Sequence, residues 1–329
     1  PIPGPFLLVS QLPFFSGNRY PSRYSVMLML VAAVLAGIGI QWLLSSHTWR
    51  RSATIVGVVF VLFWFEHLSA PLPLSNLQPP PIYARLAQEG SPDGVLLELP
   101  TGWRNGARVL GKSDILIMMQ QYYQTVHGER RLGGNTSRNP DYKFQYFSQA
   151  PVLGHLIALM NADQAYLTSQ IDELLPEWIS HDAEIAPKVL DFLGIDHVAV
   201  TVDKSPPQLL QYIEAAFPID LIDEWSGADW SGAPSTIRLY RVRTDGSAAV
   251  TEVETRSMTD TLSPLYLGEG WSTLPTEDGV RYATRAAPVL LLDLPTEGAR
   301  VTVELAAPGA AFDATVNGVP VIVEGDSTD

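Results

Sequence analysis

The sequence predicts a membrane protein in which a two-helix transmembrane hairpin carries an extracytoplasmic α/β domain and a C-terminal β-sandwich. Three observations support this prediction. Two apolar segments, 24–44 and 53–70, follow each other across a short basic loop. Residues 82–243 alternate strand-like and helix-like patterns, whereas residues 244–329 contain short strand-sized runs separated by turn residues. These patterns are typical of membrane spans, of α/β domains and of all-β domains, respectively.

The first apolar segment, 24–44, contains 21 residues and no formal charge. About 20 such residues span the hydrocarbon core of a bilayer. The second segment, 53–70, is apolar up to two polar residues near its end, and the loop 45–52 between the segments contains two arginines. Short arginine-containing loops stay in the cytoplasm. We therefore expect a multi-pass protein of the cell membrane, with the lipid bilayer as a partner and residues 75–329 outside the cytoplasm.

Charge is unevenly distributed along the 329 residues, whose formal net charge is -14. Residues 1–74 contain four arginines and one glutamate, a net of +3, which leaves -17 for residues 75–329. An acidic surface of this kind disfavours nucleic acid as a partner. The chain contains no cysteine, which excludes disulfides, thiolate metal sites and thiol nucleophiles.

Residues 1–23 contain an apolar run too short and too interrupted by proline to cross a membrane, and we expect them to lie at its outer interface. Arg19 and Arg23 have two interpretations there. They can be interfacial anchors, or their guanidinium groups can hold a lipid phosphate. Glu66, near the outer end of the second span, is either a functional carboxylate at membrane depth or a side chain that reaches the interface.

The proline-rich segment 75–81 is expected to form a stiff linker to the α/β domain. Within residues 82–243, strands are predicted at 95–100, 195–202 and 219–224, and helices at 82–89, 113–121, 151–160, 166–175, 184–193 and 206–217. The first two strands are nearly continuous apolar runs, as in strands buried on both faces. Strands that alternate with helices predict parallel pairing. Residues 102–111 are predicted to form a loop.

In residues 244–329, strands are predicted at 281–284, 289–294 and 301–306. A hairpin is predicted where Asn317-Gly318 separates residues 312–316 from 319–323, because this dipeptide favours a two-residue type I′ turn. Short strands of this kind predict a jelly-roll-like β-sandwich. Such a fold needs about eight strands and fewer are visible, so truncation of the sandwich is one interpretation.

Polar and aromatic residues cluster in residues 120–138, after the first predicted strand. Aromatic faces and a few placed polar groups are typical of small-molecule sites. The candidate substrate-binding residues in this domain are Glu98, Tyr123, Gln124, His127, Asn135 and Arg138. The last five can line a cleft for a glycan or a lipid phosphate at the carboxyl end of the 95–100 strand, where open α/β sheets bind ligands. Alternatively, the same residues cap helices and satisfy the backbone of a long loop.

Glu98 lies inside an apolar strand and needs a partner if it is buried, for which Arg104 and Arg108 are candidates. Three tryptophans can offer stacking faces for sugars, namely Trp225, Trp230 and Trp271. The third also fits the core of the β domain. The six histidines show no metal-ligand spacing, and no complete catalytic constellation is recognised.

Four short motifs are distributed over most of the chain. They are Arg19-Tyr20-Pro21-Ser22-Arg23 before an apolar helix, VLLELP at 95–100, YYQTVHG at 122–128 and LGEGW at 267–271. With them the chain resembles the C-terminal third of large bacterial multi-pass membrane proteins of the GT-C glycosyltransferase-like kind, including the YfhO-like group.

In that superfamily a sugar is moved from a polyprenyl-phosphate carrier by an inverting displacement, usually with an acidic residue in the first outer loop and often a divalent metal. The resemblance implies a glycosyltransferase-like protein of cell-envelope glycan assembly, with a polyprenyl-phosphate-linked sugar, envelope glycan and further N-terminal transmembrane helices as partners. Nothing here matches that loop, so no catalytic residue is inferred. No cofactor is expected in this segment, although a divalent metal fits the full-length protein. The alternative is a non-catalytic, membrane-anchored module that binds glycan or protein.

Overall fold

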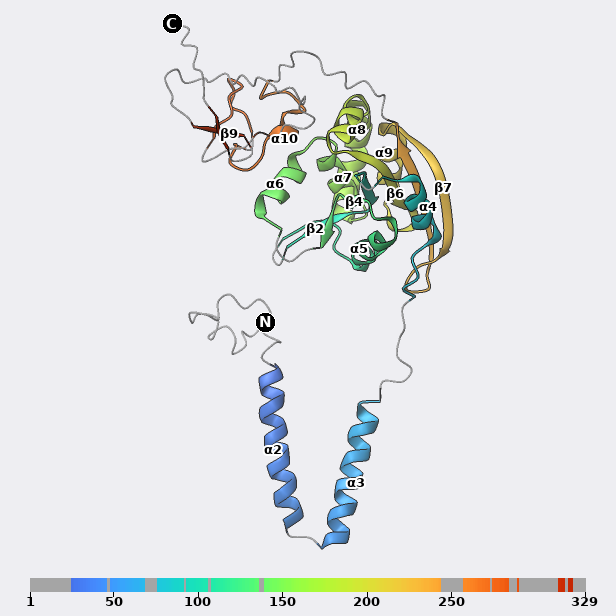
Figure 1. Cartoon of the computed structure of the whole chain (residues 1–329), viewed down its shortest axis with the longest axis vertical. Helices are drawn as coiled ribbons and strands as arrows, with labels where there is room; N and C mark the ends of the chain where they lie inside the picture. The colour runs from blue at the N-terminus through green and yellow to red at the C-terminus, as the bar shows by residue number, and fades with distance from the viewer. Residues whose placement is uncertain are drawn as a thin grey trace. The chain divides into compact units, whose positions relative to one another are not determined.

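The computed structural model describes residues 25–45, 48–68, 76–91, 93–105, 108–135, 139–243, 257–272, 274–283, 289, 313–316 and 319–321. The chain divides into two compact units, Pro1–Ser75 and Asn76–Asp329 (Figure 1). The described part of the first unit is helical, and the second unit contains the α/β domain and the segments that follow it.

The first unit begins, in its described part, with α2 (Ser25–Ser45). Large apolar side chains of this helix, such as Val26, Leu28 and Leu35, are 62–69% exposed. Among the described residues, only 25–42 form a helix long and apolar enough to cross a membrane. A signal sequence shows the same length and composition, so these two properties alone fit both roles.

The next helix, α3 (Trp49–Glu66), corresponds to the second expected span. None of its 18 residues is buried, and Phe60 and Trp64 are 66% and 59% exposed. Three charged residues lie within it, namely Arg50, Arg51 and Glu66. Composition alone therefore does not identify α3 as a span, and the two-span hairpin stays a prediction.

The core of the second unit is a five-stranded sheet with the strand order β4-β1-β6-β8-β7. Its strands are β1 (Val95–Leu99), β4 (Arg130–Arg131), β6 (Ile195–Thr201), β7 (Ile219–Ala228) and β8 (Pro234–Val242). The expected parallel pairing is present between β1 and β6, where Glu98 lies opposite Ala199, and β4 is also parallel to β1. The sequence did not predict β8, which is antiparallel to both β6 and β7, so the sheet is mixed.

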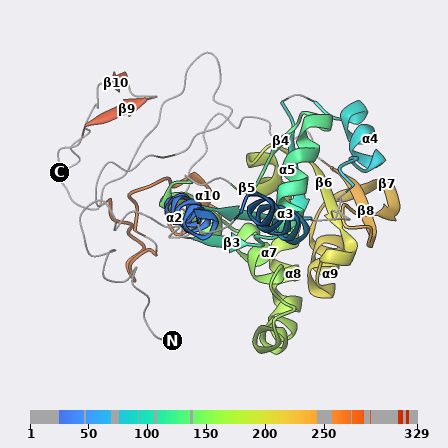
Figure 2. The ribbon, with the colours of Figure 1, turned by 90° about the horizontal axis from the view of Figure 1, so that it is seen from below.

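Helices cover both faces of this sheet, as Figure 2 shows. On one face, α7 (Leu153–Leu159), α8 (Ala165–Phe192) and α9 (Pro207–Ala216) form a core with Leu97 and Leu99. On the other face, α4 (Pro81–Glu89) and α5 (Ile115–His127) enclose Leu96. The side chains of β1 thus alternate between two cores, because successive strand residues point to opposite faces.

α8 is one helix of 28 residues, where the sequence predicted two shorter helices. Pro176 and Pro187 lie inside it. An interior proline costs about 3 kcal/mol, whereas full burial of a leucine or valine side chain contributes about 1.5–3 kcal/mol. Buried residues such as Leu175 and Val189 therefore offset the prolines. Gly194, with φ of +64°, follows the helix and leads into β6.

Two further segments differ from their predictions. Residues 102–111, expected as a loop, contain β2 (Gly102–Arg104) and β3 (Val109–Gly111), which form a small sheet with β5 (Gly134–Asn135). In the expected linker 75–81, residues from Asn76 onward belong to the second unit. The Asn76 amide donates to the Trp230 carbonyl at 2.9 Å, which attaches this stretch to the α/β domain.

Beyond residue 243, the described residues contain α10 (Ser263–Tyr266), β9 (Ala314–Val316) and β10 (Val319–Val321). β9 and β10 are antiparallel with Val316 opposite Val319, as expected for a hairpin at Asn317-Gly318. The predicted β-sandwich is not confirmed, because most of its expected strands lie outside the described residues. The Tyr146 hydroxyl on α6 (Asp141–Gln149) donates to the Leu265 carbonyl at 2.9 Å, which joins α10 to the α/β domain.

Candidate functional site

Three of the sequence-predicted site residues come together around Tyr83 of α4, namely Glu98 of β1 and Tyr123 and His127 of α5. The Tyr83 hydroxyl donates to Glu98 Oε1 at 2.8 Å. The Tyr83 ring centre lies 4.8 Å from that of Tyr123 and 5.7 Å from that of His127. All four residues are at most 7% exposed. Burial, together with the nearby Glu98 carboxylate, raises the pKa of Tyr83, so its hydroxyl stays a donor.

The partner of Glu98 is Arg131 of β4, whose Nε donates to Glu98 Oε2. It is not Arg104, which lies on β2, nor Arg108. β4 lies beside β1 in the sheet and presents Arg131 to the face that carries Glu98. Gln120 extends the network, since its Oε1 accepts from Arg131 Nη2 at 3.3 Å.

A second buried pair, which the sequence did not predict, consists of Glu129 and His197. Glu129 Oε1 lies 3.0 Å from His197 Nδ1, and the side chains are 1% and 5% exposed. The two atoms are within ion-pair distance but are not aligned for a hydrogen bond. Gly90 provides room for this carboxylate, because a Cβ at residue 90 would lie 1.9 Å from Glu129 Oε1. Burial lowers the pKa of the neighbouring His127, which disfavours its charged form.

Gln124 and Asn135 form contacts between α5 and the chain that follows it. Gln124 Nε2 donates to the Glu129 carbonyl at 2.9 Å, and the Asn135 amide donates to Gln121 Oε1 at 3.2 Å. Together with the burial of Glu98, these contacts favour the structural interpretation that the sequence left open. Glu66 is exposed at the end of α3. Arg19, Arg23 and Arg138 lie outside the described residues.

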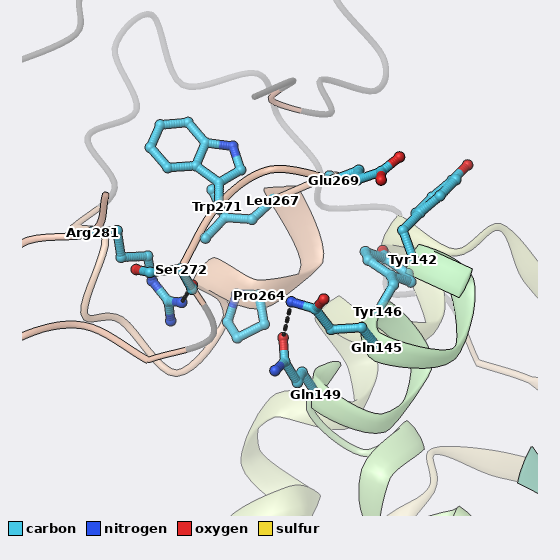
Figure 3. A pocket seen from close by; sticks show the side chains of 11 residues that line it. Tyr142, Gln145, Tyr146, Gln149, Pro264, Leu267, Glu269, Trp271, Ser272 and Arg281 are labelled. Carbon is cyan, nitrogen blue, oxygen red and sulfur yellow. Dashed lines mark hydrogen bonds between the residues drawn. The ribbon is translucent and has the colours of Figure 1, made fainter. Parts of the chain in front are cut away.

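An open hollow, which we call the α6 hollow, lies between α6 and the chain that includes and follows α10 (Figure 3). It contains about 370 Å³ of space, part of which is open solvent. One wall comes from α6 and consists of Tyr142, Gln145, Tyr146 and Gln149. The other wall consists of Pro264, Leu267, Gly268, Glu269, Trp271, Ser272 and Arg281.

The α6 wall follows from helical periodicity. Tyr142, Gln145, Tyr146 and Gln149 are spaced by three, one and three residues, which places them on one face of the helix. Gln145 Nε2 donates to Gln149 Oε1 at 3.5 Å, as Figure 3 shows. Burial and the nearby Tyr266 raise the pKa of Tyr146 to about 12, so its hydroxyl donates to the Leu265 carbonyl throughout the neutral range.

The opposite wall is held by Arg281. Its Nε donates to the Met258 carbonyl at 2.8 Å and its Nη1 to the Ser272 carbonyl at 2.9 Å. A β-bridge between Trp271 and Ala283 fixes the backbone beside it. Trp271 is half-buried and its indole stands beside the hollow in Figure 3.

The α6 hollow therefore combines aromatic rings, planar amides, a carboxylate and a guanidinium group at a site reached by solvent. Amide groups donate and accept hydrogen bonds, and aromatic rings offer an apolar face, which together suit a polyhydroxylated ligand. The sequence identified Trp271 but not Tyr142, Gln145 or Gln149. Their spacing by three and four residues was the available signal, but the sequence analysis predicted no helix at 141–149.

Comparisons with protein-family models, curated proteins and solved structures find no match. The resemblance to GT-C glycosyltransferase-like proteins therefore stays a prediction. In the part of the chain that the structure describes, no three histidine, aspartate or glutamate side chains are grouped as metal ligands. The expectations of no cofactor in this segment and of a divalent metal in the full-length protein likewise stay predictions.

Proposed function

We propose that this chain is a membrane-anchored, extracytoplasmic module that binds glycan in cell-envelope glycan assembly. The observation that carries the proposal is the α6 hollow, in which aromatic and amide side chains from two distant segments border one open space. By contrast, the Glu98 carboxylate is almost fully buried and paired with Arg131.

The walls of the hollow match the two kinds of surface that a sugar presents. The C–H face of a pyranose ring packs on an aromatic ring, and Trp271 and Tyr142 are both half-buried at the hollow. Sugar hydroxyls pair with the donors and acceptors of Gln145 and Gln149. Because the hollow is small and open to solvent, we expect it to contact only a short glycan segment.

The charge of the chain narrows the class of glycan. Residues 75–329 carry a net charge of -17, because the total is -14 and residues 1–74 carry +3. Such a surface repels polyanions at low salt. We therefore propose a neutral glycan as the ligand of the α6 hollow.

In this proposal α2 and α3 both cross the membrane, with Arg50 and Arg51 on the cytoplasmic side and residues 75–329 outside. The basic residues at the start of α3 support this orientation. The 18 residues of α3 extend about 27 Å, close to the ~30 Å core of a bilayer. Their exposed apolar side chains support the span, because water-soluble proteins rarely leave large contiguous apolar surfaces uncovered.

The resemblance to GT-C proteins suggests the larger protein to which this chain belongs. In this proposal the chain is the C-terminal part of a multi-pass glycosyltransferase-like protein. The α6 hollow holds the acceptor glycan, and a polyprenyl-phosphate-linked sugar is the donor. Arg19 and Arg23 support contact with the lipid phosphate, because guanidinium groups match phosphate oxygens in geometry and charge.

The experiment is a glycan array probed with the full chain in nanodiscs of phosphatidylglycerol. We expect binding to neutral glycans, and a loss of about tenfold or more in affinity for Trp271→Ala and for Tyr142→Ala. Tyr166→Ala is the matched control, because Tyr166 is 72% exposed and lies outside the hollow. Binding that both hollow variants retain, or no binding to any glycan, contradicts the proposal.

A further inference from the structure

A second hollow lies at the edge of the central sheet. We call it the sheet-edge hollow, and its aromatic and polar lining residues are Tyr83, Tyr123, Thr201, Trp225, Asp229, Trp230 and Ser235. Thr201 is the last residue of the parallel strand β6, and open α/β sheets bind ligands at the carboxyl ends of such strands. The sheet-edge hollow shares no lining residue with the α6 hollow.

The turn between β7 and β8 holds a carboxylate in this hollow. Asp229 is 5% exposed, and its Oδ1 accepts from the Ser231 amide at 2.8 Å, the Ser231 hydroxyl at 2.6 Å and the Ala233 amide at 3.1 Å. Its Oδ2 accepts no hydrogen bond from any described residue. Although burial raises the pKa of Asp229, the hydrogen bonds from Ser231 and Ala233 and the nearby Lys204 ammonium hold it below its usual value. The carboxylate is therefore anionic at neutral pH, and its Oδ2 lies within ion-pair distance of Lys204.

The position of Lys204 shows that a cationic group suits Asp229 Oδ2. Its Nζ lies 3.4 Å from Asp229 Oδ2, 3.4 Å from Asp203 Oδ2 and 5.9 Å from the ring centre of Trp230. Two carboxylates and one ammonium leave a net negative charge at this site. The Lys204 side chain is 34% exposed, so it can turn into solvent when another cation approaches.

Four aromatic residues belong to the lining. Tyr83, Tyr123, Trp225 and Trp230 border the hollow, and aromatic faces attract organic cations through the quadrupole of the ring. The Asn76 amide fixes the backbone of Trp230 through its bond to the carbonyl. The hollow is small and partly open to solvent, so only a small group can enter it.

We propose that the sheet-edge hollow binds an organic ammonium group, with Asp229 as the counter-charge and Trp230 and Tyr123 as ring faces. The incoming cation displaces Lys204 from Asp229, so Lys204 acts as an internal competitor. The inference does not depend on glycan binding, because the two hollows have separate linings.

The test is calorimetric titration of the full chain, in phosphatidylglycerol nanodiscs, with choline and with its neutral tert-butyl analogue. Choline is expected to bind and the neutral analogue is not. Asp229→Asn keeps the Oδ1 acceptor, removes the charge and is expected to weaken choline binding about tenfold. Lys204→Gln is expected to strengthen it. Asp223→Asn removes an exposed carboxylate of β7 outside the hollow and is expected to leave affinity unchanged.

Glucosamine, with glucose as its control, tests in the same way whether the ammonium group belongs to an amino sugar. The proposal is overturned if neither ammonium ligand binds to the wild type or to Lys204→Gln, if the neutral analogues bind equally well, or if Asp229→Asn binds as the wild type does. Thermal unfolding of each variant checks that it folds. If Asp229→Asn does not fold, Trp230→Leu takes its place with the same expected loss.

Discussion

Glu98 and Arg131 form an ion pair that is enclosed between the central sheet and helices α4 and α5, with side chains 1% and 3% exposed. Charges are buried at low cost only when they are paired and hydrogen-bonded. Here the Tyr83 hydroxyl donates to one carboxylate oxygen and Arg131 donates to the other. The attachment of α4 and α5 to the sheet therefore depends on polar contacts as well as on apolar packing.

Replacing Arg131 by methionine is expected to destabilise the second unit by about 3–5 kcal/mol, because the Glu98 carboxylate is then buried without its cation. Urea unfolding followed by tryptophan fluorescence measures the free energy of unfolding. Arg130→Met is the matched control, since Arg130 is its exposed neighbour on β4 and is expected to cost less than about 1 kcal/mol. Equal costs for the two variants contradict the inferred role of the pair.

Gly90→Ala is expected to destabilise the fold by about 1–3 kcal/mol, because the new Cβ lies 1.9 Å from Glu129 Oε1. In a Glu129→Ala background the cost should fall, since the clashing carboxylate is absent. It should not vanish, because the Leu86 carbonyl lies 3.0 Å from the same Cβ. The double-mutant cycle is measured by urea unfolding. If the changes in unfolding free energy of the two substitutions simply add, residues 90 and 129 do not interact and the prediction is contradicted.

The acid dependence of stability is expected to involve Asp182. This buried carboxylate contacts Nδ1 of His155 at 2.5 Å, Nδ1 of His181 at 2.8 Å and the Tyr212 hydroxyl. Burial alone raises the pKa of Asp182, but these hydrogen bonds outweigh it and lower the pKa. A lowered pKa in the folded state stabilises the protein above the unfolded-state value of about 3.9, and this contribution is lost as the pH falls through the folded-state pKa.

Asp182→Asn should therefore remove part of the decline in stability below about pH 4 and lower stability at neutral pH by about 1–3 kcal/mol. Unfolding free energies measured between about pH 3 and pH 7 check both effects. Asp191→Asn, an exposed carboxylate on the same helix, should change neutral-pH stability by less than about 0.5 kcal/mol. An acid decline identical in wild type and Asp182→Asn rejects this assignment.

The membrane topology can be measured with single cysteines, because the sequence contains none. Two proposed spans place Thr48, between α2 and α3, in the cytoplasm and Gln78 outside. A membrane-impermeant thiol reagent should then label Gln78→Cys in intact cells and Thr48→Cys only after permeabilisation. If α3 does not cross the membrane, both cysteines lie on the same side and label alike.

The strands with continuous apolar runs were predictable from the sequence. Residues 95–99 and 195–201 are buried on both faces, and such strands are recognised in a sequence by their nearly continuous apolar runs. β8 lacks a continuous apolar run and was missed, although Thr236 and Arg238 alternate with the buried Ile237 and Leu239, a pattern typical of a strand with one buried face. The two helices predicted at 166–175 and 184–193 form one helix, α8, because tertiary burial outweighs the effect of its prolines.

Contacts between distant residues were not predictable. Arg131 is 33 residues from Glu98, and its choice as partner depends on the strand order of the sheet. The α6 hollow depends on the contact between Tyr146 and Leu265, which are 119 residues apart. The sequence identified Tyr123 and Trp271 by residue type alone, whereas only the fold shows which hollow each one borders.

Contact between glycan and the α6 hollow can be measured by hydrogen–deuterium exchange of the full chain with and without a glycan selected on the array. We expect slower exchange at 141–149, 264–272 and 274–281, and loss of this protection in Trp271→Ala. Protection confined to residues 82–135, or unchanged exchange around the hollow while the glycan is bound, would contradict the proposed site.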